Sequence, residues 1–205
     1  MYSNERFVPI TRMKSPEVSR LEEIARAGGD LAQIEAALQQ LEGRHVGLES
    51  RMPALAALPA SEPWIADELI DMPGWHGSLF LVAKGRRLPL HDHPEMTVLL
   101  RVLAGRFAIR SYDWLPEGDG LARVVADRVV TVDDPVQVLR PREGNLHRIE
   151  ALEDGAFFDL FSPYYAEDEG RPCTYYREAE AVSPDLAPGR VRLVPCTKEE
   201  ALAQP

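Results

Sequence analysis

Two histidines separated by a single residue, His91 and His93, are the strongest chemical signal in this sequence of 205 residues. Residues i and i+2 of a β-strand point to the same face, so this spacing aims two imidazole rings at one point. Imidazole nitrogens are ligands for zinc, iron, copper and nickel ions, so the pair predicts the beginning of a metal site. A third ligand would come from His45, His76 or His147, and His147 begins another strand-like run.

The residues around these histidines have a characteristic spacing. Gly85 lies six residues before His91, Gly105 lies twelve residues after His93, and the segment that ends in His147 reads Pro-x-x-Gly-x-x-His. These spacings resemble the two motifs of the cupins, small double-sheet barrels that hold a metal ion inside. The resemblance implies a mainly β chain that folds as a cupin double-stranded β-barrel, or jelly roll.

The general cupin motif also contains a glutamate, which would fall at Thr97 or Val98 in this chain. Neither side chain ligates a metal well, and Glu95 lies at the wrong spacing. Three neutral histidines would leave the 2+ charge of a metal ion uncompensated, which favours an anionic ligand such as a thiolate. Three protein ligands on an octahedral ion also leave three positions for a substrate and O₂.

Two long segments carry a closer resemblance. LPLHDHPEMTVLLRVLAGRFAIRSYDW resembles the metal-binding segment of the plant cysteine oxidase and 2-aminoethanethiol dioxygenase family, and FDLFSPYYAEDEGRPCTYYRE resembles the second signature of that family. The resemblance runs from about residue 75 to residue 178, with His147 between the two segments. The chain departs from the family at Glu95, where glycine is usual, and at Tyr164, where proline is usual.

This resemblance implies a non-haem Fe(II) enzyme that adds both atoms of O₂ to a thiol and produces a sulfinic acid. His91, His93 and His147 carry over as the iron ligands. The implied substrate is a small aminothiol such as cysteamine, or the N-terminal cysteine of a peptide. A monomer is expected, because the family leans that way.

Four further site residues are implied by the second signature. Asp159 matches its acidic residue and Tyr165 its Pro-Tyr turn, with expected roles in contacting the substrate amine or water and in hydrogen bonding at the pocket wall. Cys173 and Tyr175 match residues that lie near the iron in animal members of the family. The resemblance suggests a covalent link between the two residues, which is a hypothesis for this chain.

Two other classes of function remain open from the sequence. Three histidines can equally hold Zn²⁺ with an activated water, which would make the protein a hydrolase or lyase. A non-catalytic cupin that binds a small ligand, or senses thiols or O₂, would bind metal without turnover. The long second signature, with Asp159 and Tyr165, favours the enzyme.

The predicted secondary structure changes near residue 60 from helices to strands. Before it, Val18, Leu21 and Ile24 recur at helical spacing, and Asp30 is placed to cap a second helix. After it, eight to ten short strand-like runs predict an antiparallel sandwich or barrel. We therefore expect a helical segment over residues 1–60 that packs on the barrel, a cupin domain over 61–196, and a loose tail over 197–205.

The net charge, the lengths of the apolar runs and the cysteine content indicate which partners and which location to expect. Lys and Arg number 23 against 33 Asp and Glu, so the net charge of −10 argues against binding nucleic acid or an anionic membrane surface. No apolar run approaches the roughly 18–20 residues of a membrane-spanning helix. The N-terminus lacks the apolar region of a secretory signal. The two cysteines form no CxxC pair and fit a reducing compartment, so a cytoplasmic location is expected.

Overall fold

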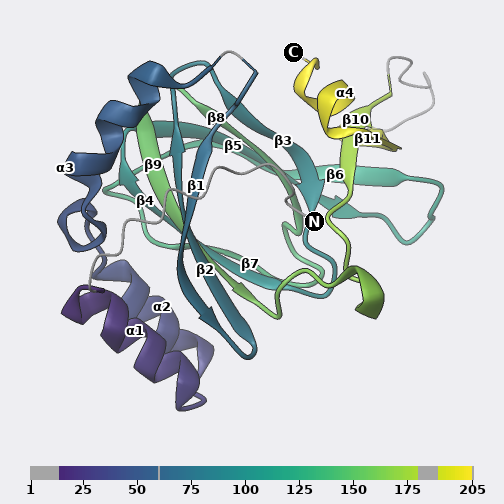
Figure 1. The fold of residues 1–205 in the computed structure, drawn as a ribbon. Helices are drawn as coiled ribbons and strands as arrows, with labels where there is room; N and C mark the ends of the chain where they lie inside the picture. The colour runs from purple at the N-terminus through teal and green to yellow at the C-terminus, as the bar shows by residue number, and fades with distance from the viewer. Residues whose placement is uncertain (1–13, 60, 180–188, 205) are drawn as a thin grey trace.

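The computed structural model describes residues 14–59, 61–179 and 189–204, and strands dominate it (Figure 1). Five antiparallel strands form one sheet in the order β1-β2-β9-β4-β7. Their bounds are β1 (Ile65–Met72), β2 (Trp75–Val82), β9 (Gly155–Ser162), β4 (Thr97–Ala104) and β7 (Gln137–Leu139). This sheet is one wall of the barrel.

Six further strands pair antiparallel and close on themselves in the order β10-β11-β6-β5-β8-β3. Their bounds are β10 (Tyr175–Glu178), β11 (Arg190–Cys196), β6 (Leu121–Thr131), β5 (Arg106–Trp114), β8 (Leu146–Ala151) and β3 (Arg87–Asp92). Two facing antiparallel sheets with few helices confirm the predicted double-stranded β-barrel.

The alternation of side chains along β9 separates two hydrophobic cores. Phe157 and Phe161 pack inside the barrel, against residues of both sheets. Phe158 and Leu160 pack on the opposite face of the first sheet. Because successive residues of a strand point to opposite faces, Asp159 lies on the same face as Phe157 and Phe161. This orientation places a carboxyl group inside the barrel.

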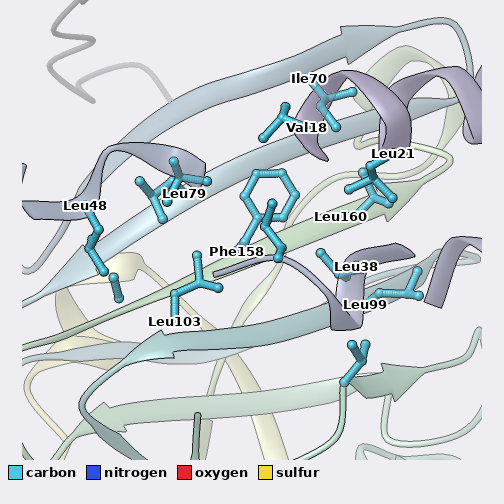
Figure 2. Packing of buried hydrophobic residues seen from close by; sticks show 14 of the residues in the cluster. Val18, Leu21, Leu38, Leu48, Ile70, Leu79, Leu99, Leu103, Phe158 and Leu160 are labelled. Atoms are coloured by element: carbon cyan, nitrogen blue, oxygen red, sulfur yellow. The ribbon is translucent and has the colours of Figure 1, made fainter. Parts of the chain in front are cut away.

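Helices cover the outer face of the first sheet. The segment before the barrel contains α1 (Pro16–Arg26), α2 (Leu31–Gln39), the 3-10 turns η1 (Gly43–Val46) and η2 (Met52–Ala57), and the short α3 (Leu48–Arg51). Leu38 of α2 packs in one cluster with Leu99, Phe158 and Leu160 (Figure 2). Helices this short are marginal alone, so this contact with the sheet supplies most of their stability.

The C-terminal residues differ from the loose tail that composition predicts for 197–205. Residues 198–202 form the helix α4 (Lys198–Leu202), in which Ala201 is buried. Thr197 and Glu200 make a capping box that satisfies the first backbone amides. The Lys198 ammonium lies 4.1 Å from the centre of the Trp64 ring. The capping box and the cation–π contact thus stabilise this short helix. The segment is polar, so its hydrophobic periodicity does not predict a helix.

Among the described residues, no helix is long and apolar enough to cross a membrane.

We expect Leu38→Ala to lower the free energy of unfolding by about 2–5 kcal/mol, because it removes a fully buried side chain from the helix–sheet contact. Chemical denaturation would measure the change. Leu31→Ala is the matched control, since Leu31 is only partly buried in the same helix and its loss should cost less. Equal effects of the two substitutions would contradict the packing described here.

Candidate metal centre

Three histidines meet at one point inside the barrel. His91 lies on β3 directly opposite His147 on β8, and His93 follows β3 by one residue. Nitrogen atoms from the three rings all lie within 4.8 Å of one another. The Nε2 atoms of His93 and His147 are 3.0 Å apart, and all three side chains are buried. The structure thus brings together the three histidines that the sequence singles out.

An irregularity in β3 orients the first of these rings. Pairing with β8 is regular at Leu88, shifts before His91, and has Pro89 within the shifted stretch. Proline has no amide hydrogen to donate to a neighbouring strand, so it belongs at such a bulge. The Pro89 carbonyl accepts a hydrogen bond of 2.8 Å from Nδ1 of His91. This bond leaves Nε2 of His91 unprotonated and able to ligate a metal.

The second ring is oriented by Tyr165. The Tyr165 hydroxyl donates its single proton to the Asp92 carbonyl at 2.8 Å. It must therefore accept from Nδ1 of His93, which lies 2.7 Å away. Nε2 of His93 is then the unprotonated nitrogen that faces His147. Hydrogen bonds of this kind to the distal nitrogen are the usual support of histidine ligands.

Burial keeps all three rings neutral. Desolvation lowers the pKa of His91 to about 4 and holds the pKa of His93 and of His147 well below the usual range. Neutral imidazole is the form that binds metal, so protons do not compete for the site near neutral pH. The donor set of three buried neutral nitrogens fits a divalent first-row ion such as Fe²⁺ or Zn²⁺.

Asn145 is a site residue that sequence reasoning missed. Its buried side-chain amide donates to the His93 carbonyl at 2.6 Å and to the Arg140 carbonyl at 3.2 Å. Its side-chain oxygen accepts from the His93 amide at 3.3 Å. Asn145 precedes His147 by two residues and lies just before β8. Its hydrogen bonds to the His93 backbone therefore tie the loop that carries His93 to the strand that carries His147. Only its closeness to His147 in the sequence could have indicated this role.

The acceptors of the ligand rings are not carboxylates. Asp92 accepts instead from the Thr174 amide at 2.9 Å and from the Tyr176 hydroxyl at 2.9 Å. These bonds fasten the end of β3 to β10, where Tyr175 pairs opposite His91. Asp92 therefore positions a strand, and its link to Tyr176 appears only in the tertiary structure.

A small pocket adjoins the histidines. Asp159, Tyr175 and His91 line it together with apolar and aromatic side chains from both sheets and from the segment before β1, namely Trp64, Phe80, Leu88, Pro89 and Phe161. Its cavity of about 10 Å³ is no larger than one water molecule needs. A thiol can therefore enter only when lining side chains shift.

Asp159 has an unusual environment in this pocket. It is 2% exposed, and its Oδ1 has no hydrogen-bond partner among the described residues. Burial raises the pKa of the Asp159 carboxyl well above its usual range, which favours the protonated, neutral form of the group. An unpaired polar atom at such depth is costly, and a polar group of a ligand would satisfy it.

The other predicted site residues lie close by. Tyr165 contacts His93 and is absent from the pocket lining, so its place is behind a candidate ligand and not at the pocket wall. Cys173 is partly buried, forms no disulfide among the described residues, and lies two residues before Tyr175. A covalent link between Cys173 and Tyr175 stays a prediction.

The two departures from the family pattern both lie near the site. Glu95 is exposed and has a φ of 59°, a left-handed conformation that glycine adopts without strain. The usual glycine thus has a backbone reason, and this chain holds the same turn with a charged residue. Tyr164 stacks on the buried His76, with ring centres 3.9 Å apart. A proline could not make that contact.

The fold and this cluster define a barrel protein with a buried three-histidine metal centre. The sequence profile of the family described as PCO_ADO matches residues 38–200, and the chain belongs to that family. The 2-aminoethanethiol dioxygenase of Homo sapiens is 30% identical over 185 residues, which cover 77% of this chain and 68% of that protein. Plant cysteine oxidase 1 of Arabidopsis thaliana is 31% identical over 160 residues, which cover 72% of this chain but only 55% of the plant protein.

Similar solved structures include KdgF from Halomonas sp., with 18% identity and a TM-score of 0.41 over 54% of this chain and 87% of that one. An RmlC-like cupin from Shewanella frigidimarina has 18% identity and a TM-score of 0.41, and covers 55% of this chain and 85% of its own.

We expect Tyr165→Phe to weaken binding of a divalent metal by about 10–100-fold, because Nδ1 of His93 loses its buried acceptor. Competition between the protein and a coloured chelator for Co²⁺ would measure the affinity. Tyr164→Phe is the matched control, since it removes the same hydroxyl from the neighbouring tyrosine that stacks on His76. Equal affinities in the wild type and Tyr165→Phe would show that Tyr165 does not support the centre.

Proposed function

We propose that this protein is a thiol dioxygenase, which adds both atoms of O₂ to the sulfur of a small aminothiol or of an N-terminal cysteine and forms a sulfinic acid. The observation that carries the proposal is the buried cluster of three neutral histidines in a chain of the PCO_ADO family. The names of the relatives, 2-aminoethanethiol dioxygenase and plant cysteine oxidase, support a substrate with a thiol close to an amine.

We propose that the metal is Fe(II) and that His91, His93 and His147 hold it. Iron in such a site supplies the redox chemistry of O₂ and lowers the pKa of a bound thiol. The contribution of the chain is electrostatic. No carboxylate of the described residues belongs to the cluster of nitrogens, so the neutral rings would leave the positive charge of the ion free to attract a thiolate.

We propose Asp159 as the group that receives the substrate amine. An amine of the substrate arrives largely as an ammonium ion, and a nearby cation favours the ionised form of a carboxyl group. Binding would therefore replace the buried neutral acid by a carboxylate paired with the ammonium, through the oxygen that has no partner among the described residues. This pairing would orient the thiol toward the wall of the pocket where His91 lies.

The other residues that line the pocket would exclude water and orient the substrate. Its lining is mostly aromatic and aliphatic, which limits the access of water to the pocket. We place Tyr175 at the substrate, because it lines the pocket opposite His91. Cys173 would act there only through the predicted link to Tyr175. We also propose that the protein acts as a monomer in the cytoplasm, where its two free cysteines would stay reduced.

The decisive experiment is anaerobic loading with Fe(II), followed by O₂ uptake and mass spectrometry with cysteamine, free cysteine, 3-mercaptopropionate and a peptide that begins with cysteine. We expect one of the amine-bearing thiols to gain two oxygen atoms. His147→Ala should lose both iron and O₂ uptake, whereas His45→Ala, far from the cluster in the first 3-10 turn, should keep both. A filled iron site that oxidises no thiol would favour a zinc enzyme or a non-catalytic cupin.

We expect Asp159→Asn to keep its iron but lose most turnover of aminothiols, because an amide cannot take up a negative charge against the ammonium. Iron content and initial rates of O₂ uptake would be measured together. Asp133→Asn is the matched control, since Asp133 is exposed in the turn after β6. Unchanged kinetics in Asp159→Asn would make Asp159 a structural residue.

A further inference from the structure

A second pocket lies on the other side of β3 from the histidines. Four arginines line it, and its cavity of about 260 Å³ is far larger than the one beside the metal centre. These are Arg87 of β3, Arg110 of β5, Arg148 of β8 and Arg177 of β10, and they define what we call the arginine pocket. Its apolar floor includes Leu90, Tyr112 and Tyr176, which belong to a small hydrophobic cluster within the closed ring of strands.

The arginine pocket concentrates positive charge in an acidic protein. The chain as a whole has a net charge of −10, yet four guanidinium groups face one lining carboxylate, Glu178. Glu178 accepts a hydrogen bond of 2.6 Å from the Tyr112 hydroxyl and lies 3.7 Å from Arg110. Asp127 also lies 3.6 Å from Arg110, but its side chain is 65% exposed. Among the described residues, the pocket lining therefore holds more guanidinium groups than carboxylates.

The register of β5 and β8 places two of these arginines next to each other. Arg110 pairs directly opposite Arg148 across β5 and β8. Like charges directly opposite each other destabilise a sheet. Nε of Arg110 is buried and has no hydrogen-bond partner among the described residues, and neither Arg87 nor Arg177 forms an ion pair with them. An anion between the arginines would relieve the repulsion and satisfy these donors.

We propose that the arginine pocket binds a small phosphate-type oxyanion, either inorganic phosphate or a phosphate monoester. Guanidinium groups match the oxygens of phosphate with pairs of parallel hydrogen bonds. A cavity of about 260 Å³ accommodates a phosphate with a short organic group. It is smaller than the roughly 300–1,000 Å³ of pockets for drug-sized ligands, so a whole nucleotide fits poorly.

This pocket is separate from the thiol site, although the two are neighbours. Pro89 lines both, and the chain of β3 runs between them. The helix α4 also borders both, because Ala201 lines the arginine pocket while Lys198 lies over the Trp64 ring of the other pocket. Oxyanion binding does not depend on the proposed dioxygenase activity and can be measured without thiol or O₂.

The test is isothermal titration calorimetry of the full chain at low ionic strength with inorganic phosphate and, separately, with glycerol 3-phosphate. We expect saturable binding of at least one, and the two arms distinguish the free ion from a monoester. The double substitution Arg87→Gln and Arg177→Gln should weaken binding at least about tenfold, because each lost guanidinium removes charge-assisted hydrogen bonds. Arg142→Gln, on an exposed loop outside the pocket, is the charge-matched control and should bind as the wild type does.

Thermal melting gives a second readout that does not depend on the heat of binding. A ligand that binds only the folded state raises the melting temperature. Phosphate should therefore raise the melting temperature of the wild type and of Arg142→Gln, but not that of the double variant. The proposal is overturned if neither phosphate compound binds saturably, or if the double variant binds as tightly as the Arg142→Gln control.

Discussion

The burial of three imidazole rings at one point is the constraint on which the rest of the site depends. Desolvation is the main cause that lowers the pKa of His91, His93 and His147 and keeps them neutral, and neutral rings do not compensate the charge of a positive ion. Neighbouring groups orient two of the three rings. A proline carbonyl and the Tyr165 hydroxyl each accept from one ring, so the nitrogens that remain unprotonated converge.

Contacts on the outer face of the first sheet and between β3 and β10 keep the strands of the site in place. β9 turns Phe158 and Leu160 toward the helices and Asp159 toward the pocket, so the same eight residues build the outer core and one wall of the site. Asp92 ties β3 to β10 through Thr174 and Tyr176. The packing of α1 and α2 on the sheet therefore supports the inner face, although no residue of either helix lines the pocket.

β3 separates two sites of opposite electrostatic character. On one side, the His91 ring and the Asp159 carboxyl line a small pocket with mostly apolar walls. On the other side, four guanidinium groups surround a larger opening. Desolvation controls the first site because water is excluded there. Direct repulsion and attraction between ions control the second, because those side chains remain partly exposed.

Features that depend on the two-residue period of a single strand follow from the amino-acid sequence. The spacing of His91 and His93 aims two rings to one side, and the alternation along β9 places Asp159 in the interior. The partners that complete the two pockets are set by the fold of the whole barrel. Tyr165, Asn145 and Arg148 acquire their partners through contacts between segments far apart in the chain, and nothing in a local pattern specifies that register. The direction of side chains along a strand alternates with a period of two residues, whereas the pairing of that strand with its neighbours depends on the packing of the whole barrel.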